Sequence, residues 1–237
     1  MNLFALDSRL LPLLVAAVVA LPLRAGAAQK LPDLDAVLSY QSSSISRNGV
    51  TKEMRFQEKM IRRDGHLWTA PVPGKIALGY EDETPAEHAA HEHFDFESAA
   101  RHLSHDAEGK LQLDYVDAAR STVVRVPPGE YEATGFTSSW ASAASLIEPG
   151  SISAMQRLKR TSPVAGAIWY EQQQGRRFSR VLWSPTLQIA LKIESGNVDG
   201  SAYRATTVRL LPATAAQKLP WLGLARLKQK EYDDFMD

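Results

Sequence analysis

Five glycine-ended dipeptides recur along this chain, each between segments rich in β-branched or aromatic residues. They are Asn48-Gly49, Asp64-Gly65, Glu108-Gly109, Gln174-Gly175 and Asp199-Gly200. Asn-Gly and Asp-Gly reach the positive φ values of tight hairpin turns at little steric cost. Several such turns in one chain favour an antiparallel meander over a parallel sheet built from strand–helix–strand units.

The segments between these turns have the composition of β-strands. Within 54–62 and 111–116, apolar side chains alternate with polar or charged ones. One face of each strand is therefore expected to pack against the core while the other meets water. The predicted strands are 37–46, 50–62, 66–70, 91–103, 110–116, 122–126, 167–173, 177–183, 188–194 and 203–211.

Three segments interrupt the β pattern. Residues 138–146 and 152–158 are rich in Ala, Ser, Met and Leu, and Pro149-Gly150 lies between them, which predicts two short helices joined by a hinge. Pro220 can begin a helix without losing a hydrogen bond, and apolar residues recur after it. A C-terminal helix is therefore predicted over 220–236.

A large antiparallel sheet must cover its apolar face and protect its edges. Strong curvature around the central helices would meet both needs. The predicted fold class is therefore mainly β: a strongly curved antiparallel sheet, forming an open half-barrel, covered by two or three short α-helices. Because the chain has no internal repeat, a single domain over 28–237 is the simplest organisation.

Residues 1–27 have the character of a secretory signal peptide. An almost unbroken apolar run over 10–21 follows Arg9, and Ala25-Gly26-Ala27 offers the small side chains that signal peptidase accepts. A helix of about a dozen residues spans about 18 Å, short of the roughly 30 Å hydrocarbon layer. We expect cleavage after Ala27 and a soluble periplasmic chain without a transmembrane span. An uncleaved membrane anchor is the alternative, and Asp7 is atypical of a signal peptide.

Several classes of chemistry are excluded by residue content. None of the 237 residues is a cysteine, which rules out disulfides, thiolate metal sites, iron–sulfur clusters and thiol nucleophiles. The 27 basic residues equal the 27 acidic ones, so nucleic acid is not an expected partner. The common nucleophile, phosphate-loop and dinucleotide motifs are missing from the sequence, and no catalytic residue is assigned.

The order of hairpins, helices and further hairpins after an export signal resembles the periplasmic lipoprotein-carrier fold of the LolA and RseB type. Residues 180–194 supply the strand–turn–strand unit that carries this resemblance. Members of that fold bind acyl chains or other apolar ligands in a concave cavity beneath a helical lid. The resemblance implies an unclosed barrel whose partner is a lipid, another apolar small molecule or an envelope protein. The histidine-rich middle of the chain departs from it.

The leading functional hypothesis is therefore an exported, non-enzymatic binding or carrier protein. Its candidate ligand-binding residues are Trp140, Leu146, Ile147 and Met155, on or beside the predicted central helices. Short helices rich in Ser and Ala bury little area, so they can lift from a sheet at small cost. A plainer hypothesis is an assembly factor that docks through the predicted C-terminal helix.

Five of the six histidines lie within residues 88–105. If 91–97 is a strand, its alternate side chains share one face, while Phe94 and Phe96 turn to the core. Imidazole and carboxylate ligands suit zinc or copper. The alternative hypothesis is a periplasmic metal-binding accessory protein, with candidate ligands His88, His91, His93 and Asp95. A solvated polar face is the interpretation favoured for this stretch by itself, and a proton-linked switch is a further one. The His-Glu-x-x-His pattern of zinc hydrolases is missing from the sequence.

Overall fold

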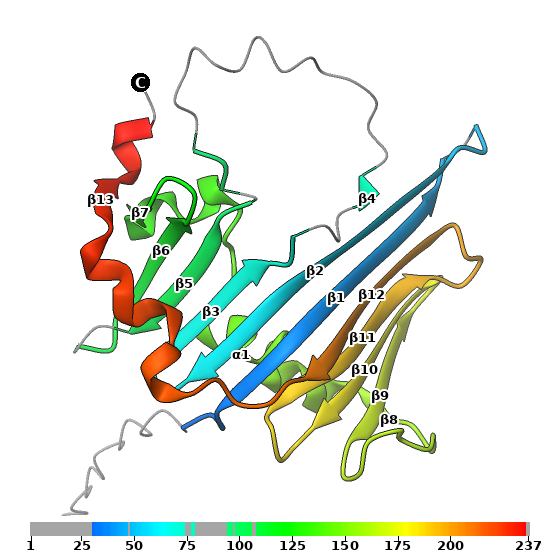
Figure 1. The fold of residues 1–237 in the computed structure, drawn as a ribbon. Helices are drawn as coiled ribbons and strands as arrows, with labels where there is room; N and C mark the ends of the chain where they lie inside the picture. The colour runs from blue at the N-terminus through cyan, green and yellow to red at the C-terminus, as the bar shows by residue number, and fades with distance from the viewer. Residues whose placement is uncertain are drawn as a thin grey trace, which may run out of the picture.

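The computed structural model describes residues 30–46, 48–73, 77–78, 94–96, 98–105 and 108–235. The predicted signal peptide, its cleavage site, His88, His91 and His93 lie outside these described residues. The described chain forms a 13-stranded sheet (Figure 1). Its strands are β1 (Leu34–Ile45), β2 (Thr51–Arg63), β3 (His66–Pro71), β4 (Ala77–Leu78), β5 (Ala100–His105), β6 (Leu111–Asp117), β7 (Thr122–Val126), β8 (Gln156–Arg157), β9 (Ile168–Gln174), β10 (Arg177–Ser184), β11 (Ile189–Asn197), β12 (Ala202–Leu210) and β13 (Lys228–Glu231).

The sheet is antiparallel except at one edge. Its order is β13-β7-β6-β5-β3-β2-β1-β12-β11-β10-β9-β8, with β4 beside β2, and only the β7–β13 pair is parallel among the described strands. At the centre, β1 pairs with β12 from Ala36 opposite Leu210 to Ser44 opposite Ala202. This long-range pairing joins the first group of hairpins to the last. Because β13 and β8 occupy opposite edges, the sheet stays open.

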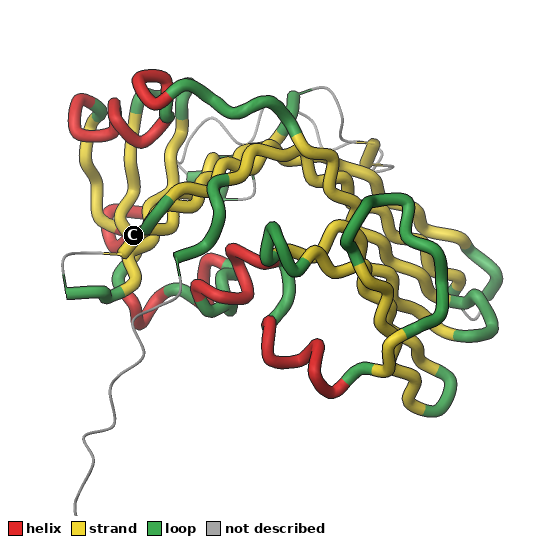
Figure 2. The backbone as a smooth tube through the Cα atoms, turned by 90° about the horizontal axis from the view of Figure 1, so that it is seen from below, coloured by secondary structure: helices red, strands yellow, loops and turns green. Residues whose placement is uncertain are grey.

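A helical segment connects the two halves of the sheet. It leaves β7, reaches β8, and contains α1 (Trp140–Ser145). The sheet bends around this segment (Figure 2). The predicted fold class, a mainly β open sheet with short helices, is confirmed. The 3-10 helices are Pro128–Glu130, Glu132–Thr134, Pro149–Ala154, Ala216–Lys218, Pro220–Arg226 and Tyr232–Phe235.

Of the two predicted central helices, the one over 138–146 is shorter than expected and the other is absent from 152–158. α1 begins after Ser139, whose Oγ accepts a hydrogen bond from the Ser142 amide, and it ends at Leu146, where φ is 63°. The helix predicted over 152–158 is wrong. A 3-10 helix ends at Ala154 there, and β8 follows because Gln156–Arg157 pairs with β9.

The strand predicted over 91–103 is also wrong in its described first part. Residues 94–96 and 98–99 form a turn, and β5 begins only at Ala100. The Asp95 side chain accepts a hydrogen bond from the Ser98 amide at 3.2 Å, which offers the backbone an alternative to strand pairing. The expectation that Phe94 and Phe96 face the core is confirmed, since both belong to the main hydrophobic cluster.

The C-terminal helix predicted over 220–236 is replaced by a 3-10 helix, the strand β13 and a second 3-10 helix. Tertiary pairing explains the difference. Leu227 is extended, and the Lys228 amide donates to the Ser121 carbonyl at 2.9 Å, so the chain adds a strand to the exposed edge of β7. Residues 219–235 are termed the C-terminal arm.

The two faces of the sheet are covered differently. On the inner face, Leu38 and Met60 pack in the main core with Ala144 of α1. On the outer face, Ile61 and Trp68 pack against the C-terminal arm through an apolar group made of Leu219, Trp221, Leu224 and Leu227. The arm then continues past β7, and Tyr232 joins the main core. The apolar residues predicted for docking therefore pack within the molecule itself.

Candidate functional site

Two adjoining cavities lie on the inner face of the sheet. Their volumes are about 530 Å³ and about 220 Å³, and both are lined by Thr69, Arg101 and Gly135. Together they are termed the inner cavity. The molecule's own side chains fill the part of the inner face beneath Ala144, so the cavity is the part that the core leaves open.

Aromatic and aliphatic side chains dominate the wall of the larger cavity. Alternate residues of β2 point to the inner face, which places Met54 and Phe56 in the wall. Phe96 meets Tyr115 edge-on at a ring distance of 5.0 Å. The Tyr115 hydroxyl donates to the Thr134 carbonyl at 3.2 Å, which fixes this part of the wall. The remaining apolar wall residue is Ala99.

Charged groups line the same cavity. Glu58 and Asp95 lie in its wall with Arg101, whose guanidinium carbon is 5.8 Å from the centre of the Phe136 ring. In the smaller cavity, burial raises the pKa of Tyr40, and the neighbouring Glu58 adds to that rise. Tyr40 therefore remains a neutral hydrogen-bonding group. The larger cavity therefore combines aromatic and aliphatic wall surface with polar and charged residues, which are Glu58, Thr69, Asp95, Ser98, Arg101 and Thr134.

Of the four predicted ligand-binding residues, the structure places Leu146 in the wall of the smaller cavity. Trp140 packs against the main core, with its ring 4.4 Å from that of His105. Ile147 and Met155 pack on a separate cluster around Ile152. The sequence analysis did not name the wall residues that lie on the strands. The apolar alternation over 54–58 could have identified Met54 and Phe56, because it places both side chains on the inner face.

The predicted metal site receives no support from the described residues. Asp95 is exposed and its carboxylate caps the turn at Ser98, while the three histidines proposed beside it lie outside the described residues. Across the described ranges, no group of three His, Asp or Glu side chains is placed to hold a metal ion.

A pair of imidazoles lies on the outer face instead. His66 Nδ1 and His102 Nε2 are 3.0 Å apart, so one of these nitrogens donates to the other. The Trp221 ring stacks over both, at ring distances of 5.1 and 5.7 Å and interplanar angles of 10° and 9°. His102 Nδ1 faces the buried Asp114 carboxylate at 3.7 Å. The three rings link β3 and β5 to the C-terminal arm, and the Asp114 carboxylate of β6 faces them.

Burial, with a smaller contribution from His102, lowers the pKa of His66 below its ordinary value. Burial acts to raise the pKa of Asp114, but the facing His102 imidazole, a hydrogen bond from Gln112 and the charge of Arg125 outweigh it, so that pKa is lowered. These directions favour the neutral form of the His66 imidazole and the ionised form of the Asp114 carboxylate. Sequence spacing grouped His102 with 88–105, whereas its partner is 36 residues earlier in the chain.

A further cavity of about 570 Å³ adjoins the imidazole pair. It lies between the start of β1 and the C-terminal arm, and His66 and Trp221 are in its wall. The Arg63 guanidinium forms an ion pair with the buried Asp35 carboxylate there, at 2.6 Å. The Lys30 ammonium and the Asp64 carboxylate, both in this wall, form a second, exposed ion pair at 3.0 Å.

Comparison with known proteins gives no match to a family model or to a curated protein sequence. Three of the solved structures that match are similar in part. PNGF-II matches 86% of this chain at 12% identity and a TM-score of 0.35, and this chain spans only 32% of it. An outer membrane lipoprotein-sorting protein domain from Vibrio parahaemolyticus matches 80% of this chain and 91% of its own, at 11% identity and a TM-score of 0.29. A DUF1329 family protein from Desulfovibrio piger matches 83% and 92%, at 8% identity and a TM-score of 0.34.

The lipoprotein-sorting domain is the kind of protein that the sequence resembles, so the resemblance has a counterpart among solved structures. All three TM-scores lie below 0.5. In the part of the chain that the structure describes, no helix is both long and apolar enough to cross a membrane.

Proposed function

We propose that this chain is an exported, non-enzymatic binding or carrier protein that holds an apolar ligand in the inner cavity. The observation that supports this is the larger cavity of about 530 Å³, with Phe56, Phe96 and Tyr115 in its wall. Small-molecule sites commonly have volumes of about 300 to 1,000 Å³ and mostly apolar walls. A lipid or another apolar molecule fits this description.

The helical segment over the inner face is proposed as the movable cover. Within α1, only Ala144 and Ser145 are buried, and Trp140 and Ala143 are partly buried against the main core. Lifting this short helix exposes that area and breaks the hydrogen bond from Arg62 to the Ala144 carbonyl. Leu146 follows directly and contacts the smaller cavity. Trp140, Ile147 and Met155 remain proposed gating residues, because each is attached to this segment.

Filling the cavity provides the first test. Ala99 lines the larger cavity, so an Ala99→Phe side chain would occupy space that the ligand needs. We expect the apparent Kd of this variant for a fluorescent fatty-acid probe to rise about tenfold or more. The added ring prevents contacts between probe and wall, and the binding free energy of those contacts is lost. The measurement is probe fluorescence titrated against purified protein.

The matched control is Ala118→Phe, which adds the same ring at an exposed turn position that lines neither part of the inner cavity. Its affinity for the probe should equal that of the unmodified protein. The proposal is contradicted if the unmodified protein takes up no probe, or if Ala99→Phe binds as tightly as the control while both variants remain folded by circular dichroism.

A further inference from the structure

Three hairpin turns form one continuous ridge at one end of the sheet. The turns of β1–β2, β9–β10 and β11–β12 lie at the same end (Figure 1). The Ile45 amide donates to the Ser201 carbonyl at 2.9 Å, and the Val198 amide donates to the Arg176 carbonyl at 2.8 Å. These bonds tie each turn to the next. The described residues of 45–52, 174–177 and 197–204 are termed the tip ridge.

The turns of the tip ridge are held in defined conformations. Ser46 Oγ hydrogen-bonds to both the amide and the carbonyl of Val50 across the first turn. In the third turn, Asn197 Nδ2 donates to Ser201 Oγ at 2.8 Å, and the Ser201 amide donates to the Asp199 carboxylate at 3.0 Å. Side chains on these turns are therefore presented from a fixed backbone.

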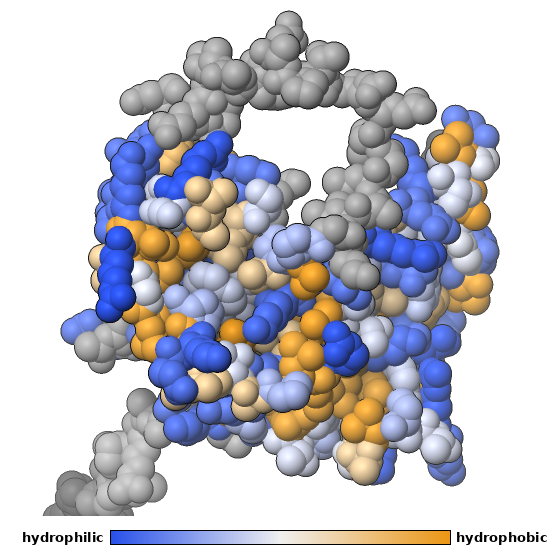
Figure 3. Space-filling model, in the orientation of Figure 1, coloured by the Kyte–Doolittle hydropathy of each residue, from blue (hydrophilic) through white to orange (hydrophobic). Residues whose placement is uncertain are grey.

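The tip ridge exposes aliphatic side chains. Ile45 and Val50 are each 51% exposed, and Val198 is 62% exposed. Figure 3 shows hydrophobic atoms among hydrophilic ones at the end of the β1–β2 hairpin. Two of these side chains belong to the first turn and one to the third, so the ridge carries only three exposed aliphatic groups. A protein partner bound by a standard interface needs about 800 Å² of contiguous surface on each side.

The same ridge has a surplus of positive charge although the whole chain is neutral. Its basic residues are Lys52, Arg176, Arg177 and Arg204, all exposed, and its acidic residue is Asp199. Asp199 is paired with Arg176 at 2.7 Å. Within the described ranges, no ion pair involves the other three basic side chains.

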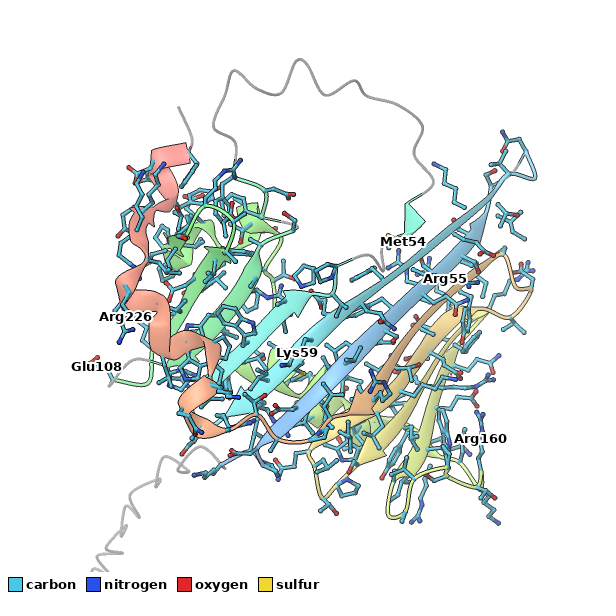
Figure 4. The ribbon with its side chains drawn as sticks, in the orientation of Figure 1. Met54, Arg55, Lys59, Glu108, Arg160 and Arg226 are labelled. Carbon is cyan, nitrogen blue, oxygen red and sulfur yellow. The ribbon has the colours of Figure 1, made fainter. Side chains whose placement is uncertain are left out.

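We infer that the tip ridge docks onto the surface of an anionic lipid bilayer. Projecting aliphatic side chains flanked by cations combine shallow apolar insertion with attraction to acidic headgroups, and stable attachment usually needs two such contributions. Met54, which lines the inner cavity, lies on β2 toward this same end (Figure 4). Docking would therefore bring the mouth of the cavity close to the membrane, although the inference itself does not depend on a bound ligand.

Vesicle co-sedimentation tests this inference with the purified chain and no added ligand. We expect binding to vesicles of phosphatidylcholine mixed with phosphatidylglycerol, and a bound fraction lower by about fivefold or more on phosphatidylcholine alone. Two double variants should each reduce the bound fraction on the anionic vesicles by about fivefold. The first replaces aliphatic side chains, Ile45→Ser with Val198→Ser, and the second replaces cations, Arg177→Glu with Arg204→Glu.

Matched controls are Leu222→Ser and Val164→Ser, which remove side chains 59% and 40% exposed elsewhere on the surface. They should bind as the unmodified protein does. The inference is overturned if the chain does not bind anionic vesicles at low salt, or if the controls lose as much binding as the ridge variants. Loss with the charge variant alone would show electrostatic adsorption without insertion and would overturn it as well.

Discussion

At the scale of single residues, Gly196 shows how closely two backbones approach in this sheet. It lies in β11 between Phe178 of β10 and Tyr203 of β12. A Cβ atom added at Gly196 would lie 2.3 Å from the Ala202 carbonyl oxygen. Glycine inside a strand commonly marks such a close approach, because any other side chain forces the neighbouring backbone to move.

Gly196→Ala is therefore expected to destabilise the fold by about 2 kcal/mol, within the range for strained core substitutions. The measurement is the free energy of unfolding in urea. Gly223→Ala is the control, since a Cβ there meets nothing within 4 Å. Equal stability of the two variants would contradict the close approach of β11 and β12.

At the scale of elements, the C-terminal arm depends on the imidazole pair. Trp221 stacks on His66 and His102, which attaches the beginning of the arm to the outer face together with Leu219. The arm ends on the other side of β7, where the Tyr232 ring is 5.6 Å from Phe96 in the wall of the inner cavity. The arm thus connects the outer-face histidines to the proposed ligand site.

Acidification should loosen this arm. The folded-state pKa of His66 is lowered, so its contribution to stability is present above the unfolded value of about 6.5 and is lost as pH falls through the lowered pKa. Protonation places a charge beside His102, opposed only in part by Asp64, which is paired with Lys30 at 3.0 Å. Asp114 contributes in the same direction at lower pH, because its pKa is also lowered.

Hydrogen exchange of residues 219–231 provides the measurement. We expect protection to decrease between neutral and mildly acidic pH, and His66→Gln, which cannot gain a charge, should flatten that decrease. His105→Gln removes a histidine that contacts Trp140 instead, and it should leave the pH dependence unchanged. Protection that does not vary with pH in the unmodified chain would refute the role of His66.

At the scale of the whole molecule, Arg62 ties distant segments together. Its side chain is 0% exposed. It donates to the carbonyls of Pro32, Ala144 and Gln188 at 3.0, 2.6 and 3.2 Å, and also to that of Leu187. These acceptors belong to the chain before β1, to α1 and to the β10–β11 turn. Burial lowers the pKa of Arg62 to about 10, opposed in part by the charge of Asp33, so the side chain remains charged at neutral pH.

Arg62→Met should destabilise the molecule by about 3 kcal/mol or more, because it leaves several buried carbonyls without a donor. Urea unfolding measures the loss. Arg209→Met, at an exposed position of β12, is the matched control and should change stability little. A loss below about 1 kcal/mol would mean that water replaces the guanidinium, contrary to its buried position.

Local sequence patterns determined much of the strand layout. The turn dipeptides and the alternation of apolar and polar residues predicted β7 with its observed bounds, 122–126. They also predicted the ends of the hairpin strands to within a few residues. Local chemistry suffices there, because a tight turn and an apolar face are set by neighbouring residues. The same patterns predicted a mainly β, open and curved sheet, which the structure confirms.

Only the tertiary structure decided which distant segments meet. Three contacts join residues far apart in the chain. They are the pairing of β1 with β12, the addition of β13 to β7, and the contact between His66 and His102. Local propensity carries no information about such partners. The C-terminal arm shows the reason, since the open edge of β7 supplies hydrogen bonds that make a strand more favourable than the helix its sequence favours.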